Sequence, residues 1–255
     1  MVFRRAIALI IGLAVPLVGM QIIGAPAQAA ELKVLSSTAL KAVLEELAPQ
    51  FEKATEVKVV LTIAASAVLK ARIDQGAAFD VAVLAPNLID SLAAAGKVDP
   101  NTRAAIARSG LGVSVRAGAA TPDVGTAEAL KRTLLDAKSI GFNGQGASRV
   151  GIEALFAKLG IAEELKPKIV LLKTNAPEGV ARGEVELALS PISEIVAVSG
   201  AQLAGAVPAE YQTYLTLVAA IAADSPSADA ARSLIKYLTA PAASPVIRAK
   251  GMEPG

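Results

Sequence analysis

Short apolar runs alternate with helix-like stretches along almost the whole chain after residue 30, and this alternation constrains the fold most. The strand-like runs are 32–35, 57–63, 80–85, 111–116, 139–142, 169–172, 186–189 and 211–222. The helix-like stretches are 40–51, 66–75, 87–95, 102–109, 126–137, 148–159, 177–182 and 228–237, with a short one after Pro191. Strands that alternate with helices across short turns indicate α/β units with parallel sheets and helices on both faces.

The composition agrees with such a fold and excludes several kinds of chemistry. Hydrophobic residues make up 53% of the chain and aromatic residues only 3%, so Ala, Val and Leu would fill the core, as they do around buried parallel strands. There is no cysteine and no histidine. Disulfides, zinc sites built on those ligands, and Ser–His or Cys–His catalysis are therefore excluded.

The first thirty residues have the pattern of a secretory signal peptide. Arg4 and Arg5 precede an apolar run over 6–23, and small residues follow at 25–30, as in the three regions of such a signal. We expect cleavage after Ala29 or Ala30 and a periplasmic mature protein. A retained membrane anchor is the alternative, because the apolar run is long for a signal.

Loss of this leader would remove the apparent basicity of the chain. Without the two leader arginines, 23 of the 25 basic residues remain, equal to the 23 acidic residues. A neutral mature chain gives no support to nucleic-acid binding.

A stretch rich in Gly, Ala and Pro at 117–124 divides the pattern into two tandem α/β units. We predict two lobes, each a mainly parallel sheet flanked by helices, joined by crossovers near 112–116 and 213–218. Lobe 1 would comprise residues 31–113 and 217–255, and lobe 2 residues 114–216. A monomer is expected.

Three turns combine a strand end, small hydroxyl residues and a helix start, namely 36–40, 65–67 and 144–149. Parallel α/β sheets bind ligands at such positions. No acid occupies the first helical positions of the three turns, where basic Lys41, Lys70 and Arg149 occur instead. Acid-free helix starts leave backbone amides open to an anion. The alternative is that Thr38, Ser66 and Ser148 are only N-caps.

Enzymatic signals are weak. The run Gly144-Gln145-Gly146 lacks the lysine of a phosphate-binding loop, so no nucleotide or other cofactor is expected. No pair of carboxylates is placed for acid–base catalysis. We therefore predict a protein that is not an enzyme, and no metal site. An enzyme that uses Ser66 or a lysine as its nucleophile is the rival hypothesis.

Several motifs resemble the periplasmic molybdate-binding proteins of ABC transporters and their broader molybdate-binding-like solute-binding relatives. They are the segments 36–40, 64–80, 146–150, 159–161, 180–187, 193–195, 204–210 and 250–254. The resemblance covers the whole mature chain. It implies a two-lobed type II periplasmic binding protein fold, and an oxyanion held by hydroxyls and backbone amides without charged side chains.

Carried over residue by residue, the resemblance assigns a partial binding site. Ser66 falls on the second serine position of the family, followed by Ala67. The first serine position falls on Ala39, which has no hydroxyl, with Thr38 beside it. The third turn places a ligand amide near Ser148, and the family's tyrosine falls near Pro191.

These departures leave the ligand open. Arg149 either compensates for the missing donors through a charge-assisted bond or lies on the surface. The resemblance implies a periplasmic solute-binding component that closes on a molybdate- or tungstate-like oxyanion and delivers it to an ABC transporter permease. The alternatives are an organic carboxylate or other oxyanion as the ligand, or a sensory or envelope protein without a transporter.

Overall fold

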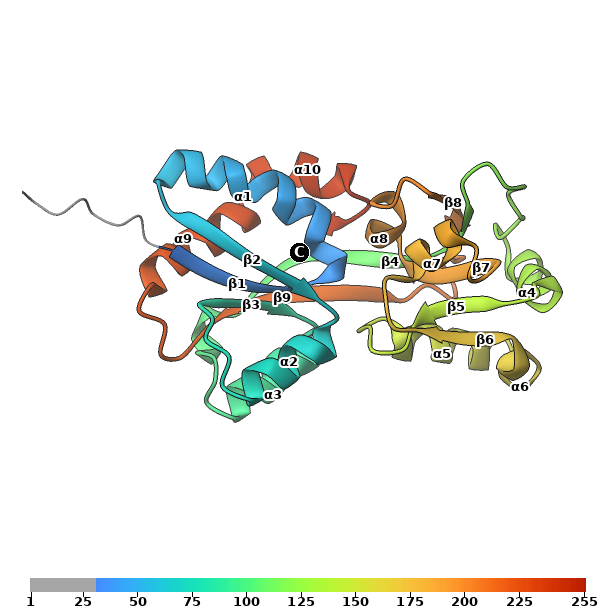
Figure 1. The fold of residues 1–255 in the computed structure, drawn as a ribbon, viewed down its shortest axis with the longest axis horizontal. Coiled ribbons are helices and arrows are strands. Elements are labelled where there is room, and N and C mark those ends of the chain that lie inside the picture. The colour runs from blue at the N-terminus through green and yellow to red at the C-terminus, as the bar shows by residue number, and fades with distance from the viewer. Residues whose placement is uncertain (1–30) are drawn as a thin grey trace, which may run out of the picture.

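The computed structural model describes residues 31–255, so the predicted signal peptide lies outside the described residues. The described chain forms two lobes side by side (Figure 1). Within this part of the chain, no helix is long and apolar enough to cross a membrane.

Lobe 1 contains both ends of the described chain. Its strands are β1 (Glu31–Ser37), β2 (Lys58–Ala64), β3 (Val81–Leu84), β9 (Tyr214–Ile221) and β10 (Glu253–Pro254), with the first half of β4 (Ala104–Arg116). Its helices are α1 (Lys41–Thr55), α2 (Ser66–Asp74), α3 (Pro86–Ala94), α9 (Ala228–Thr239) and α10 (Ser244–Ala249), with 3-10 turns η1 (Thr38–Leu40), η2 (Pro100–Thr102) and η4 (Pro241–Ala243). The strand order is β2-β1-β3-β9-β4.

Lobe 2 is built from the middle of the chain and the second half of β4. Its further strands are β5 (Ile140–Asn143), β6 (Ile169–Leu172), β7 (Leu187–Pro191) and β8 (Ala201–Ala206). Its helices are α4 (Ala127–Asp136), α5 (Arg149–Lys158), α6 (Ala162–Leu165), α7 (Ala176–Arg182) and α8 (Ile192–Val196), with the 3-10 turn η3 (Lys166–Lys168). The order continues as β4-β7-β5-β6, and β8 also pairs with β4.

Helices cover both faces of each sheet (Figure 1). In lobe 1, α1, α9 and α10 bury one apolar cluster against the sheet, and α2 and α3 bury another on the opposite face. In lobe 2, α4, α5 and α6 cover the larger cluster, and α7 covers a smaller one. This is the layered α/β architecture that the alternation of strands and helices predicted.

The parallel strands of the two lobes point toward each other. β1, β2 and β3 are parallel, and β9 runs antiparallel to β3. β4 runs antiparallel to β9 through Gly110 and antiparallel to β7 from Leu111 onward, while β7 is parallel to β5 and β6. The parallel strands of lobe 1 therefore point along β4 toward lobe 2, and those of lobe 2 point back. The carboxyl ends of both sets meet between the lobes.

Most predicted elements are observed within a few residues, and two differences stand out. The predicted helix over 102–109 is wrong, because η2 ends at Thr102 and β4 begins at Ala104. This segment pairs with β9 on one side and β10 on the other, so tertiary pairing overrides its helix-favouring alanines. The strand β8 was not predicted, since its sequence AQLAGA contains no β-branched residue. The residue boundaries predicted for the lobes stay a prediction.

Candidate functional site

The first feature of the interlobe face is the α2 corner, defined as residues 64–67, where β2 passes into α2. Ser66 is the first residue of α2 and is 1% exposed. Its hydroxyl oxygen has no hydrogen-bond partner among the described residues. The interpretation of Ser66 as an N-cap is wrong by one position, because Ala65 is the N-cap and has no side chain that could cap the helix. The Ser66 hydroxyl is therefore buried without serving the helix.

Two backbone amides of the α2 corner also lack a partner among the described residues. The amides of Val68 and Leu69 both donate to the Ala65 carbonyl oxygen, at 2.9 and 3.1 Å. Within residues 31–255, the amides of Ser66 and Ala67 donate no backbone hydrogen bond, and no acid occupies the first turn of α2. Ala67 is exposed. Free amides at a helix start attract an anion.

Thr38 lies beside this corner. Ser37 is the register partner of Ala64 in the parallel pair of β1 and β2, so Thr38 and Ala65 leave neighbouring strands at the same level, about 5 Å apart. Thr38 is half-buried. Ala39, by contrast, is 2% exposed and belongs to the apolar core of lobe 1. Of these two predicted site residues, only Thr38 offers a polar group.

Lobe 2 contributes the α8 corner, defined as residues 190–194, where β7 passes into α8. Its helix packs directly on the backbone of β4, because a Cβ at Gly112 would lie 2.9 Å from the Ile192 side chain. Pro191 is buried and pairs with Leu111 of β4. The hydroxyl of Ser193 is buried and, like that of Ser66, lacks a hydrogen-bond partner within the described residues.

Glu194 is the one charged side chain of this corner, and it contacts the other lobe. The Thr38 hydroxyl donates to Glu194 Oε1 at 2.6 Å, and Glu194 is only 8% exposed. Burial raises the pKa of the Glu194 carboxyl to about 7; the hydrogen bond from Thr38 opposes this shift, and the negative charge of Glu178 adds to it. The contact joins the two lobes beside the α2 corner.

The α5 corner, defined as residues 143–149, also reaches lobe 1, since Ala147 packs against the apolar core of that lobe. Ser148 is the N-cap of α5, but its side chain makes no capping hydrogen bond. Arg149 donates to Glu153 Oε1 at 2.7 Å and to the Gly144 carbonyl oxygen at 3.0 Å. The Arg149 guanidinium is therefore engaged by its own helix and its own turn.

Sequence reasoning missed the Ser193 hydroxyl and two further polar groups of this face. Asn175 precedes α7 at the end of β6, and its side-chain oxygen is buried without a partner in the described part of the chain. Glu194 enters the sequence analysis only as part of the family motif 193–195. The signal that could have singled it out is a charged residue inside the short apolar segment ISEIV. Among residues 31–255, no group of three or more His, Cys, Asp or Glu side chains could hold a metal ion.

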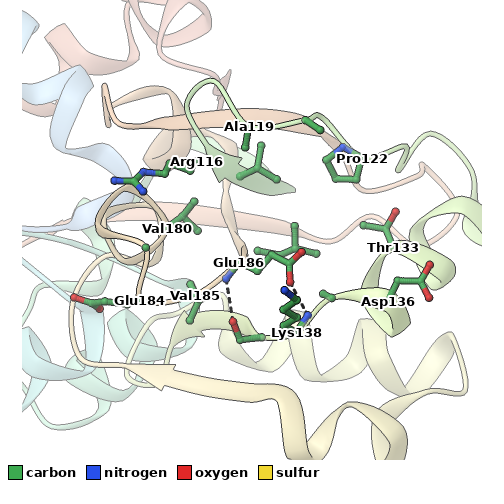
Figure 2. A pocket seen from close by; sticks show the side chains of 16 residues that line it. Arg116, Ala119, Pro122, Thr133, Asp136, Lys138, Val180, Glu184, Val185 and Glu186 are labelled. Carbon is green, nitrogen blue, oxygen red and sulfur yellow. Dashed lines mark hydrogen bonds between the residues drawn. The ribbon is translucent and has the colours of Figure 1, made fainter.

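A cavity of about 710 Å³ lies elsewhere in lobe 2, between the turn after β4 and the segments that precede β5 and β7 (Figure 2). Two hydrogen bonds link residues of its lining: the Lys138 amide donates to Glu186 Oε2 at 2.6 Å, and the Glu186 amide donates to Ser139 Oγ at 3.0 Å. It lies where the parallel strands begin, whereas α/β sheets bind ligands where strands end. We therefore place the candidate site at the interlobe face.

The chain is similar to known proteins over most of its length. Aconitate isomerase from Pseudomonas sp. is 30% identical over 230 residues, covering 88% of this chain and 87% of the relative. The molybdate-binding protein ModA of Azotobacter vinelandii is 27% identical over 240 residues, covering 91% and 94%. The solved structure of the periplasmic molybdate-binding protein of the same organism superposes with a TM-score of 0.75 at 23% identity, covering 87% and 98%.

The structural likeness shows the fold, a type II periplasmic binding protein fold, as the sequence predicted. The model of a protein family described as "Bacterial extracellular solute-binding protein" matches residues 32–253. That match spans nearly all described residues, including the α2, α5 and α8 corners, and the chain therefore belongs to the bacterial extracellular solute-binding protein family.

Proposed function

We propose that this chain is the periplasmic binding component of an ABC transporter, and that it captures a small anion between its lobes and delivers it to a permease. The buried, unpartnered hydroxyl of Ser66 at the start of α2 carries the proposal. A buried hydroxyl left without a partner costs about 1–3 kcal/mol, which a ligand oxygen would recover. The free amides of Ser66 and Ala67 add two more donors to the same anion.

Capture would occur by hinge closure. The anion meets the α2 corner of lobe 1, and the α5 and α8 corners of lobe 2 complete the shell. Both lobes already contribute to this face through the contact between Thr38 and Glu194. Because the donor groups come from both lobes, ligand binding favours the closed form, and a transporter can distinguish the closed form from the open one.

An organic carboxylate is the ligand class that we favour, with a molybdate- or tungstate-like oxyanion as the alternative. Ala39 and Pro191 offer no hydroxyl where the molybdate-binding proteins have a serine and a tyrosine, so two donors to a tetrahedral oxyanion are missing. A 30% identical relative is named for aconitate, a small carboxylate. The 27% identical relative is named for molybdate, so both classes belong in the test.

Calorimetry of the mature protein against molybdate, tungstate, sulfate, phosphate and a panel of di- and tricarboxylates tests this function. We expect one class to bind, and Ser66→Ala to weaken it about tenfold, the equivalent of one hydrogen bond. Ser233→Ala is the matched control, since the Ser233 hydroxyl only donates to Asp229 within α9. An unchanged affinity in Ser66→Ala would refute the site, and no heat with any anion would refute the function.

Isomerisation of a small polycarboxylate is a second candidate function, and Glu194 is the observation that favours it. Moving a double bond within a polycarboxylate takes a proton from one carbon and returns one to another, without an oxidant or cofactor. Such proton transfer needs a group that titrates near neutral pH, and burial raises the pKa of Glu194 to about 7. Proton NMR of the protein mixed with cis- or trans-aconitate tests this, with Glu194→Gln expected to abolish conversion.

A further inference from the structure

A buried carboxyl stands at the edge of the proposed anion site, where a negative charge opposes the ligand. Glu194 is 8% exposed, and its Oε1 accepts the Thr38 hydroxyl from the other lobe at 2.6 Å. Thr38 leaves β1 at the level where Ala65 leaves β2, one residue before Ser66. An anion bound at the α2 corner would therefore lie close to the Glu194 carboxyl.

No cation among residues 31–255 pairs with this carboxyl. Glu194 forms no ion pair within residues 31–255, and η1, β7 and β8, which pack around α8, contain no ionisable side chain. The nearby charges are Glu178, the arginines of β4 and α7, Lys41 at the start of α1 and Lys250 just after α10. Four of these cations pair with other acids: Arg182 with Glu178 and Glu184, Arg108 with Glu253, Lys41 with Glu45, and Lys250 with Glu46. The fifth, Arg116, ends β4 beside Gly183.

An ionised Glu194 would thus repel the anion in a poorly hydrated setting, where like charges interact strongly. Protonation of the Glu194 carboxyl turns this repulsion into attraction. A protonated carboxyl donates a hydrogen bond to the ligand or to Thr38 Oγ1, which frees the Thr38 hydroxyl to donate to the anion. Burial has already raised the pKa of Glu194 to about 7, so the proton is available near neutral pH.

Resting on the proposed function, we propose that Glu194 is a specificity-determining residue, through which the interlobe site takes its anion together with one proton. A fully ionised anion gains this proton from solvent as it binds. An anion that carries an acidic hydrogen of its own brings the proton with it. The site therefore favours anion and proton as a pair over the bare anion.

Calorimetry with molybdate and with tricarballylate, a saturated tricarboxylate that an isomerase cannot convert, tests the pairing. Titrations in two buffers with different ionisation enthalpies count the protons taken up. For the wild-type protein, we expect about one proton per bound anion well above the pKa of Glu194, and an affinity that falls about tenfold per pH unit there, since one proton is linked to one site. In Glu194→Gln, the proton uptake and the pH slope should both disappear. Glu164→Gln, which removes an exposed acid of α6, should keep both.

Each outcome supports or overturns the pairing. Binding by the wild-type protein without proton uptake overturns it, and so does an unchanged pH slope in Glu194→Gln. If that variant does not fold, the proton count of the wild-type protein decides alone. Failure of the proposed function looks different, because neither probe nor any other anion of the wider panel would then bind at any pH.

Discussion

The α2 and α8 corners begin alike and differ in one respect. Each follows a parallel strand, opens a helix at the interlobe face and buries a serine hydroxyl without a partner, Ser66 in lobe 1 and Ser193 in lobe 2. The α2 corner has no acid in its first turn, whereas the α8 corner buries Glu194. In the proposed site, the α2 corner therefore attracts an anion at every pH, and the α8 corner opposes it unless Glu194 is protonated.

This difference separates affinity from selectivity. The attraction of the α2 corner comes from backbone amides and one hydroxyl, which do not titrate near neutral pH. The opposition of the α8 corner comes from one carboxyl whose pKa burial raises to about 7. Changes at the first corner should alter how tightly any anion binds, and changes at the second should alter the pH at which it binds.

The largest expected effect comes from making the α2 corner resemble the α8 corner. Ala67→Asp places a carboxylate on the free amides of α2, where it stabilises the helix by about 0.3–1 kcal/mol and occupies the anion's position. Two like charges about 4 Å apart near a protein surface repel by about 4 kcal/mol, so affinity should fall about 1,000-fold. Calorimetry of anion binding and thermal unfolding would measure the two opposite effects.

Ala67→Asn is the neutral control for this substitution. It has nearly the same size and retains a side-chain oxygen, but it adds no charge, so its loss of affinity should be far smaller. Equal losses in the two variants would mean that space rather than charge decides. A fully retained affinity in Ala67→Asp would place the anion away from the α2 corner.

The next effect concerns stability at the α8 corner. The pKa of Glu194 rises from an ordinary 4.5 in the unfolded chain to about 7 in the folded one. Below pH 4.5 the carboxyl is protonated in both states and carries no penalty. Between about pH 4.5 and 7 the unfolded chain ionises this carboxyl while the folded chain keeps it protonated, so stability falls, and the loss is complete once pH passes about 7. We expect a loss of about 3 kcal/mol, at about 1.4 kcal/mol per pKa unit.

Glu194→Gln should lack this loss. Urea unfolding of the wild-type protein and the variant between about pH 5 and pH 9 would show the two stabilities diverging up to about pH 7 and staying a constant distance apart above it, with Glu164→Gln following the wild type. Parallel stability profiles of wild type and Glu194→Gln would show that the carboxyl is solvated in solution.

Local sequence was sufficient to predict the α2 corner, because its parts are neighbours in the chain. The apolar run before Ala64, the absence of an acid after Ser66 and the stop at Gly76 all lie within about twenty residues. The pKa of Glu194, by contrast, depends on burial between the lobes, which raises it, and on the hydrogen bond from Thr38, 156 positions away, which opposes the rise. The helix that contains Glu194, α8, is only five residues long, which is too short for a periodic pattern to predict which of its side chains are buried. The predicted helix over 102–109 was wrong for the same reason, since β9 and β10 supply its hydrogen-bond partners.

A smaller effect is expected from breaking the hydrogen bond between the corners. Thr38→Val keeps the shape of the side chain but removes the only hydrogen bond that the Glu194 carboxyl accepts within residues 31–255. Leaving the ionised carboxyl unsatisfied should cost about 1–2 kcal/mol above pH 7 and less below it, and should raise the pKa of Glu194 further. Urea unfolding at two pH values measures both, and Thr38→Ser, which keeps the hydroxyl, should behave as wild type. A cost independent of pH would indicate lost packing instead.

The smallest effect is expected at the α5 corner. Of the three predicted turns, 36–40, 65–67 and 144–149, only the last contains a cation, Arg149, and Glu153 and Gly144 already bind its guanidinium. Arg149 pairs with Glu153 while both side chains are nearly half exposed, and such pairs contribute at most about 0.5 kcal/mol. Arg149→Gln should therefore shift stability by no more than this and anion affinity by less than about threefold. Glu153→Gln breaks the same pair and leaves Arg149 bonded only to the Gly144 carbonyl oxygen, so it should tighten anion binding only if the guanidinium can then reach the ligand. A loss above about tenfold in Arg149→Gln would instead correspond to a charge-assisted bond to the ligand. The interlobe site would then rely on a charged side chain as well as on amides and hydroxyls, and the contrast between the α2 and α8 corners would no longer account for its affinity.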